Sequence, residues 1–395
     1  MEDFIFLMNR SQLKKTLHKY FIFVVLGLMA IIVVSSPMLK NEMNLPKYYK
    51  QLFEEAKVTR IVDQTLEEDH VIPGMQIGKQ SLEIEVLTGK YKGNTYETVN
   101  LLSRGHNVYA TEGLHVIVGL REVDDGSVNA WVYNHKREGY IYLLIGLFFT
   151  LLLIFGGMKG LHAALSLVFT GIMIVFVMIP LIFKGNNPMI VSIACTSIIA
   201  IISFILIGGF ERKTTAAIAG TLIGITMAGI LSYVFGNLVN LSGMNMDKGE
   251  QLIYIAQDYQ IQIHGLMFAS ILIASLGAVM DVSMSIASSM QEIFTTRPNI
   301  SRKDLLKSGL VVGRDIMGTM ANTLILAFAG GSLSLILLIW GYQMQYRQMI
   351  NMPFISIEII QGLSGSIGII LTVPFTALVS AWLIEKKKHK ESPSS

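Results

Sequence analysis

The sequence predicts a mostly α-helical, polytopic membrane protein with about eight transmembrane helices and a small β-barrel-like domain outside the membrane. Of its 395 residues, 52% are apolar and only 15% are charged, and its mean hydropathy is +0.54. An ordinary soluble domain is less hydrophobic than this. The apolar residues are grouped in runs of about 20, long enough to cross a hydrocarbon core of ~30 Å as helices. One polar insert has the alternating pattern of β-strands instead.

Eight apolar runs are candidate membrane spans. The last is long for a single span, and Pro374 inside it predicts a kink, because proline removes a helical hydrogen bond. The runs are Tyr20–Leu39, Tyr140–Met158, Leu161–Phe183, Met189–Phe210, Thr214–Leu238, Leu266–Ile286, Ile316–Trp340 and Ile355–Ile384. They divide the chain into a cytoplasmic N-terminus with a signal-anchor helix (1–39), an extracytoplasmic domain (40–139), a seven-span domain (140–385) and a basic cytoplasmic tail (386–395).

The distribution of Lys and Arg predicts the orientation. Segments on the side of the N-terminus carry 16 of these residues, whereas the short loops on the other side carry three, Lys184, Lys248 and Arg347. Because basic loops remain in the cytoplasm, we expect a multi-pass protein of the cell membrane with both termini inside. The first run also has the basic start of a cleavable signal peptide. Pro37 directly after Ser36 disfavours cleavage, so we expect an uncleaved anchor.

The polar insert is expected to fold as a small β-domain. A helix-like stretch, residues 44–60, opens it. SLEIEVLT then alternates apolar and acidic residues, and a YKGN turn leads to TYETVN, which predicts a hairpin. LHVIVGLREV and SVNAWVYN predict a second hairpin around the Asp124-Asp125-Gly126 turn. With VTRIVDQ these segments give about five strands, enough for a closed or half-closed OB-like barrel. The net charge of the insert, −3, predicts no nucleic-acid binding.

Three stretches resemble the YibE/F family of bacterial multispanning membrane proteins. They are SLEIEVLTGKYKG in the insert, GGFERKTTAAIAGTLIG around the start of the fifth run, and HGLMFASILIASLGAVMDVSMSIASSMQE in the sixth. The resemblance covers most of residues 58–384. The anchor and outer β-domain look like those of the YibE branch. The resemblance implies a shorter YibF-like membrane protein, lacking both, as a partner, and it implies no particular activity.

The fifth run carries small residues at strict four-residue steps. Ala216, Gly220, Gly224 and Ala228 begin this series, which continues for two further steps. Such a stripe lets a neighbouring helix approach closely, which is how helices associate in lipid. The pattern predicts a helix-packing face, and a substrate path along the same face is the alternative.

Asp281 is the candidate functional residue of the sixth run. No charged residue precedes it from Leu266 onward, and Gly277, Ser285 and Ser289 share its helical face at four-residue steps. A charged side chain at mid-helix costs roughly 2.5–3.5 kcal/mol on insertion scales, so it usually faces protein or water. Asp281 lies toward the predicted cytoplasmic end of this span, and the alternative is a boundary residue that reaches into water.

A second polar face is predicted in the next run. Asp315, Thr319 and Asn322 fall on one side of a helix. If this face meets the face of Asp281 and Ser285, the two form a polar seam that could carry a cation or proton. The alternative for Asp315 is a helix N-cap, where its negative charge would be stabilised by the helix dipole.

Several function classes find no support in the sequence. A Gly-x-x-x-x-Gly-Lys-Ser/Thr stretch and an HExxH motif are both missing, and the eight histidines are scattered. The single cysteine, Cys195, reads as a packing residue. The surroundings of Asp281 and Asp315 lack the Gly-x-Gly-Asp pattern of intramembrane aspartyl proteases.

We therefore expect no enzyme activity and no catalytic, cofactor-binding or metal-binding residues. The lipid bilayer is the expected environment. A permease or exporter-like function fits the polar faces best. A non-transporting membrane scaffold that presents the outer domain to a partner or to the cell envelope remains the alternative.

Overall fold

A computed structural model describes residues 2–42, 51–123, 126–246, 248–259 and 261–391. Within these ranges it leaves out the side chains of residues 2–11, 13–15, 36–42, 258 and 385–391. The chain forms two compact units. One is made of Met1–Met43 and Leu153–Ser395 and is helical, and the other, Asn44–Leu152, contains the β-sheet. Each unit is described by itself.

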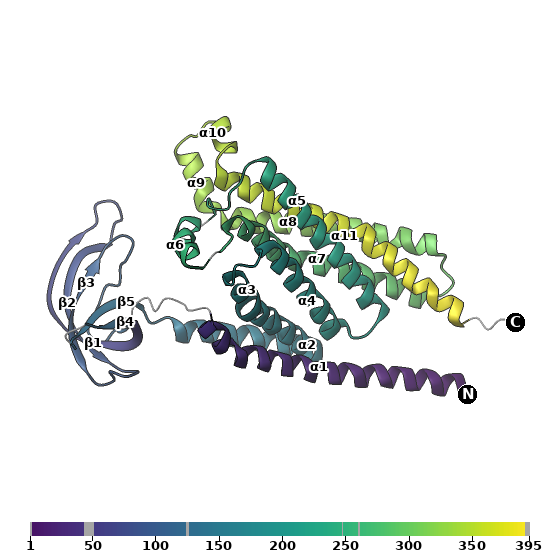
Figure 1. Ribbon diagram of the computed structural model, residues 1–395, viewed down its shortest axis with the longest axis horizontal. Helices are drawn as coiled ribbons and strands as arrows, with labels where there is room; N and C mark the ends of the chain where they lie inside the picture. The colour runs from purple at the N-terminus through teal and green to yellow at the C-terminus, as the bar shows by residue number, and fades with distance from the viewer. Residues whose placement is uncertain (1, 43–50, 124–125, 247, 260, 392–395) are drawn as a thin grey trace. The chain divides into compact units, whose positions relative to one another are not determined.

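The β-unit contains one curled antiparallel sheet (Figure 1). Its strands are β1 (Gln51–Glu68), β2 (Gln76–Val86), β3 (Thr95–Leu102), β4 (His115–Glu122) and β5 (Val128–His135), in the order β3-β2-β1-β4-β5. Because each neighbour reverses direction, the two edge strands β3 and β5 run parallel. The curl brings them together, since the Thr98 hydroxyl donates a hydrogen bond to the Ala130 carbonyl at 2.7 Å. The predicted half-closed barrel is confirmed.

Alternating apolar residues build the core of this sheet. Leu82, Ile84 and Val86 of β2 point inward with no exposed surface, as the period of two predicts. The helix-like reading of residues 44–60 is wrong from Gln51 onward, and its first part lies outside the described residues. Strand β1 pairs with β4 through its first half and with β2 through its second. These two ladders override the local helical preference.

The other unit contains eleven α-helices and one π-helical turn in the described ranges, and Figure 1 shows the longer helices lying alongside one another. They are α1 (Glu2–Glu42), α2 (Glu138–Met173), a π-helical turn η1 (Ile174–Met178), α3 (Ile179–Phe183), α4 (Pro188–Gly208), α5 (Arg212–Leu238), α6 (Gly249–Tyr259), α7 (Ile263–Thr296), α8 (Arg302–Gly331), α9 (Leu333–Gly341), α10 (Tyr346–Ile350) and α11 (Pro353–Glu391). The start of α2, up to Leu152, belongs to the β-unit.

Seven helices within the described residues are long and apolar enough to cross a membrane, where the sequence predicts about eight spans. The difference lies in Glu138–Phe183, a helical stretch of 46 residues. Such a stretch would measure about 69 Å if straight, more than twice the ~30 Å hydrocarbon core. Gly157 interrupts it with φ 51° and ψ −132°. This glycine lies at the end of the second predicted span, just before the third begins.

Three further predicted boundaries change. Helix α7 continues ten residues beyond Ile286, and α8 begins at Arg302 and ends at Gly331, with the rest of the predicted seventh span in α9. Helix α11 continues through Pro374 to Glu391. The side chains of the basic tail lie outside the described residues, so the tail stays a prediction.

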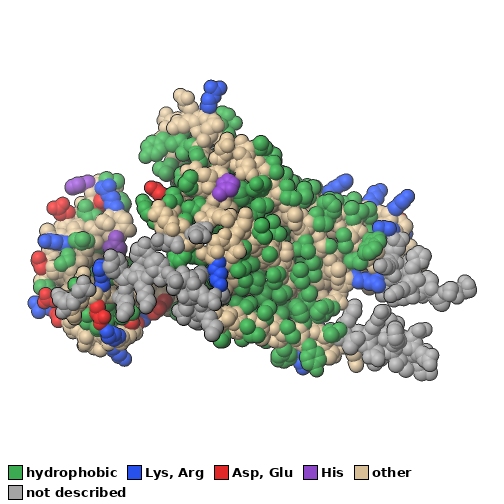
Figure 2. All heavy atoms as spheres, in the orientation of Figure 1, with side chains coloured by type: hydrophobic (Ala, Val, Ile, Leu, Met, Phe, Trp, Pro, Cys, Tyr) green, Lys and Arg blue, Asp and Glu red, His purple; other side chains and the backbone are tan. Residues whose placement is uncertain are grey.

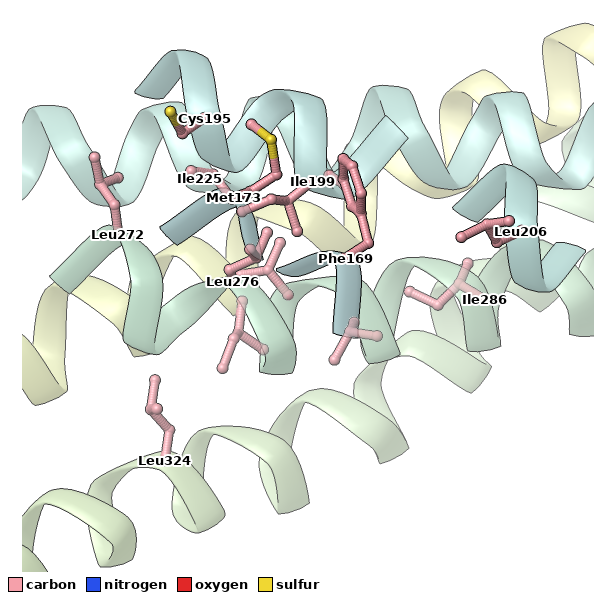
Figure 3. Packing of buried hydrophobic residues seen from close by; sticks show 14 of the residues in the cluster. Phe169, Met173, Cys195, Ile199, Leu206, Ile225, Leu272, Leu276, Ile286 and Leu324 are labelled. Atoms are coloured by element: carbon pink, nitrogen blue, oxygen red, sulfur yellow. The ribbon is translucent and has the colours of Figure 1, made fainter. Parts of the chain in front are cut away.

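Hydrophobic side chains fill the centre of the helical unit and also cover its sides. Figure 3 shows residues of α2, α4, α5 and α7 converging on one region, among them Met173, Ile199 and Leu276. On the face in Figure 2, hydrophobic side chains spread over the helices, and Lys and Arg side chains stand mainly near their ends. An apolar exterior around an apolar core is the arrangement that a lipid environment favours.

Helices α5 and α11 pack closely against each other. A Cβ atom added to Gly220 would stand 1.8 Å from the hydroxyl oxygen of Thr376, and one added to Gly224 would stand 1.8 Å from that of Thr372. As the residue number rises by four on α5 it falls by four on α11, so the two helices are antiparallel. The predicted packing residues of α5, which include Ala216 at no exposed surface, thus lie at a helix interface. The stripe of small residues explains why these backbones come so close.

Gly224→Leu should destabilise the protein strongly. Its side chain would meet the Thr372 hydroxyl, the Gly368 carbonyl at 3.0 Å and Val279 at 3.0 Å, two of them on the facing helix. Overpacking of this kind typically costs about 1–3 kcal/mol. The matched control is Gly171→Leu, because Gly171 is an exposed helical glycine with no atom within 4 Å of an added Cβ. Thermal unfolding of the purified variants should show a lower midpoint for Gly224→Leu alone, and equal midpoints would contradict the close packing.

An ion pair between the buried Asp69 and the exposed Arg104 stabilises the turn between β1 and β2. The Asp69 carboxylate accepts hydrogen bonds from Arg104 Nε at 2.6 Å and from the backbone amides of Val71 at 2.7 Å and Ile72 at 2.9 Å. The Arg104 hydrogen bond is the main reason that the pKa of Asp69 falls from 3.8 to about 2, and the amide bonds contribute to the same shift. Folding therefore favours the ionised carboxylate.

This shift predicts an acid-dependent loosening of the turn. Because the folded-state pKa is depressed, the stabilisation is complete above pH ~4 and is lost as the pH falls toward ~2. Asp69→Asn should therefore speed hydrogen exchange around Val71 and Ile72 at neutral pH, and the difference from the parent should vanish at low pH. Exposed Asp63→Asn is the control. A difference that persists unchanged at pH ~2 would show that the charge of Asp69 is not the cause.

Candidate functional site

Helix α7 carries Asp281 near its middle. The helix begins 18 residues before Asp281 and ends 15 residues after it. Asp281 therefore lies near the middle of the helix, and its depth in the membrane stays a prediction. The buried face of α7 includes Val279, Val282 and Ile286, each with no exposed surface. Asp281 lies on the opposite side and is exposed, as is Gly277, while Ser285 is half-buried.

Helix α8 carries the second polar face. Its N-cap is Ser301, whose hydroxyl oxygen accepts a hydrogen bond from the Asp304 amide at 3.1 Å. Asp315 therefore does not cap this helix, and the N-cap alternative is wrong. Gly313 is buried on the side of α8 that packs into the unit. Asp315 is ~200° further round the helix at ~100° per residue, and it is exposed.

The contacts between α7 and α8 place the two polar faces at the same level. A Cβ at Gly309 would stand 2.4 Å from Met290, and one at Gly313 would stand 3.2 Å from Ile286. The contact positions step by four in opposite directions, so the helices are antiparallel. Continuing the same register sets Asp281 level with Gly318. Asp315 and Asn322 then stand about one turn away, or ~5 Å, on either side of that level.

The structure brings these residues to one level but leaves them open. Asp281, Asp315, Thr319 and Asn322 are all exposed. Thr319 donates its hydroxyl hydrogen to the Ile316 carbonyl at 2.9 Å, a bond within its own helix. In the described part of the chain, neither aspartate nor Asn322 has a hydrogen bond or ion pair. The two polar faces therefore do not close over each other within one chain, and their role as a seam stays a prediction.

A row of buried small and hydroxyl residues on α11 was not predicted. Its members follow four-residue steps along the face that packs on α5, with Thr376 and Ser380 among the buried hydroxyls that find no hydrogen-bond partner in the described residues. The members are Ser364, Gly368, Thr372, Thr376 and Ser380. The same four-residue period that identified the packing face of α5 is present here and could have revealed it.

Glu358 was also not predicted. It is half-buried and lines a cavity of about 380 Å³ between α8, α9, α10 and α11, among otherwise mostly apolar side chains such as Phe328 and Ile339. It is the only charged residue of Pro353–Ile384. A lone charge in a long apolar run is the signal that singled out Asp281, and it applies equally to Glu358.

The described residues do not form a recognisable metal-binding site. Among the described residues, no three His, Cys, Asp or Glu side chains come together in a way that could hold a metal ion. The carboxylates of the candidate site lie one per helical face, with hydroxyl and amide groups beside them.

The family model for YibE/F-like proteins matches residues 144–386. The chain belongs to the YibE/F family. The match covers most of the helical unit, including both polar faces, α5 and α11, whereas the β-sheet lies outside it. Searches among curated proteins and among solved structures give no match. Family membership, together with the apolar helices, identifies a multispanning membrane protein of the YibE/F type.

Proposed function

We propose that this protein is a permease or exporter-like protein that moves a cation or a proton past Asp281 and Asp315. The proposal rests on one observation: two carboxylates stand at nearly the same level on adjacent candidate membrane-spanning helices, without a partner among the described residues. A charge in such a segment costs free energy and typically marks an ion or proton route.

The charge balance favours a positively charged solute. Between Leu266 and Met290 of α7 and between Leu310 and Gly331 of α8, the charged residues are Asp281, Arg314 and Asp315. Arg314 compensates one carboxylate, and one negative charge remains for each chain. Thr319 and Asn322 add oxygen atoms of the kind that bind cations. We assign no catalytic chemistry to these groups. Transport would therefore be driven by a gradient across the membrane.

Neutralising either carboxylate should abolish transport without preventing folding. We expect Asp281→Asn and Asp315→Asn to reconstitute into liposomes like the parent but to lose proton or cation flux. Flux is measured with an enclosed pH-sensitive dye, and with dyes for sodium and potassium, under an imposed diffusion potential. The control is Glu292→Gln, an exposed carboxylate on α7 beyond the polar face. Parent protein without flux above that of empty liposomes, or variants with full flux, would overturn the proposal.

The orientation belongs to the same proposal. The excess of Lys and Arg on one side favours a multi-pass protein of the cell membrane with both termini in the cytoplasm. In a Cys195→Ala background, an impermeant maleimide added to intact cells should label Asn94→Cys and spare Lys303→Cys. Both positions are exposed in their own units. Labelling of Lys303→Cys alone would reverse the orientation.

A scaffold that presents the β-unit is the second candidate, and one observation favours it. Phe53, Trp131 and Tyr133 form an aromatic cluster on the outside of the sheet, with ring centroids 6.3 Å and 4.8 Å apart from Phe53. Beside it a cavity of about 430 Å³ opens between β3 and β5. Exposed aromatic clusters of this kind mark binding surfaces. Full activity of both aspartate variants would favour this candidate.

A further inference from the structure

We propose that a second copy of this chain covers the polar face of α7 and α8. This face is defined by Asp281, Arg314, Asp315, Gly318, Thr319 and Asn322, all exposed in the single chain. The inference goes beyond the proposed function, because it rests on the cost of exposing these groups to lipid and holds whether or not the protein transports a solute.

Exposure of this face to hydrocarbon is unfavourable. A charged residue at the centre of a membrane helix costs roughly 2.5–3.5 kcal/mol on insertion scales, and such residues nearly always face protein or a water-filled cavity. Helix α8 is the least hydrophobic of the seven candidate spans, and it is also among the least covered. In the single chain, the least hydrophobic candidate span is therefore left largely uncovered by protein. A protein surface packed against α8 would shield it from lipid.

The protein's own N-terminal helix packs elsewhere and does not cover this face. Val25 and Met29 of α1 are buried in the core cluster. His18 of α1 contacts His162 of α2, with ring centroids 5.1 Å apart, and Phe21 contacts Phe210. Helix α1 thus packs along α2 and α4, away from α8.

The charges of this face are complementary to those of a second copy of the same face. The face carries a base, Arg314, directly beside an acid, Asp315. Two copies inserted in the same direction are related by a twofold axis along the membrane normal, so residues at equal depth oppose each other. Arg314 of each copy then lies ~1.5 Å in depth from Asp315 of the other. The side-chain amide of Asn322 can both donate and accept a hydrogen bond. Asn322 of one copy can therefore pair with Asn322 of the other.

The centre of the face has space for a neighbouring helix. A Cβ at Gly318 or Gly277 would meet no atom within 4 Å, so the centre of the face is flat and open. Glycine at such a position allows two helices to approach closely, and hydroxyl and amide groups beside it add interhelical hydrogen bonds. A symmetric contact through Gly318 would place Asp281 of both copies beside one enclosed polar region. The seam that one chain leaves open would then be closed by two.

The test uses cysteine crosslinking in native membranes. The chain has a single cysteine, so Cys195→Ala gives a clean background. Gly318→Cys should form a disulfide-linked dimer on copper-catalysed oxidation, because a disulfide requires Cα atoms about 4.4–6.8 Å apart. Gly171→Cys, on an equally open helical glycine of α2, is the control and should remain monomeric. No dimer at Gly318, or equal dimer at both positions, would overturn the inference.

A charge exchange tests the twofold geometry. Arg314→Asp alone places like charges opposite each other and should abolish the Gly318→Cys crosslink. Adding Asp315→Arg restores the opposite signs and should recover it. Size-exclusion elution and thermal unfolding of each variant show that the protein is folded. Failure of the double exchange to recover the crosslink in a folded protein would overturn the symmetric pairing.

The mass of the crosslinked species shows which protein covers the face. Native mass spectrometry of the crosslinked species should give twice the mass of the chain. An adduct with a different protein, such as a shorter relative of the same family, would overturn the second copy as the occupant. Parent protein that forms the dimer but carries no flux would count against the proposed function only. Parent protein that carries flux but forms no dimer would count against this inference only.

Discussion

The close approach of α5 and α11 is the contact on which the helical unit depends. Neither Gly220 nor Gly224 can carry a side chain unless these two helices separate, since each faces a threonine hydroxyl of α11. Lipid offers no hydrophobic force between helices, so this fit and the hydrogen bonds around it must supply cohesion. Helix α7 lies against the pair, because Ser283 accepts a hydrogen bond from Thr221 at 2.8 Å and Ser270 one from Gln361 at 3.1 Å. These contacts hold α7 with Asp281 on its outer side.

The polarity of the unit follows from this arrangement. Among the described residues of the helical unit, the buried polar side chains are all uncharged Ser, Thr or Gln. Many of these side chains donate a hydrogen bond to a backbone carbonyl of their own helix, as Thr372 does to the Gly368 carbonyl at 2.8 Å. The charges of α7 and α8 are instead outside. A route through the centre would require α5 and α11 to part, whereas a route along the outer face requires only a cover.

Periodicity and hydropathy predicted the helices and the β-hairpins, and a four-residue period predicted the packing face of α5. These patterns failed where the structure of a segment depends on contacts with residues far away in the sequence. Strand β1 looks helical locally, yet Ala56 pairs with both β2 and β4, and Val58 pairs with β2. The pair Arg314-Asp315 looked like the start of a span, yet Ser301 caps a helix that runs through it. A helical period identifies a face but not its neighbour. The exposure of Asp281 therefore could not be read from the sequence.

Contact between two helices does not by itself explain why the face of α7 and α8 carries charged residues. Thr319 and Asn322 are sufficient to hold two membrane helices together, since uncharged polar groups provide interhelical hydrogen bonds. Two carboxylates add a desolvation penalty, and one guanidinium cannot offset both. Because a charge retained against such a penalty typically has a role beyond packing, the unmatched carboxylate is more simply explained by a positively charged solute than by the contact. The proposed contact between copies and the proposed passage of a cation or proton would thus account for different members of the same face.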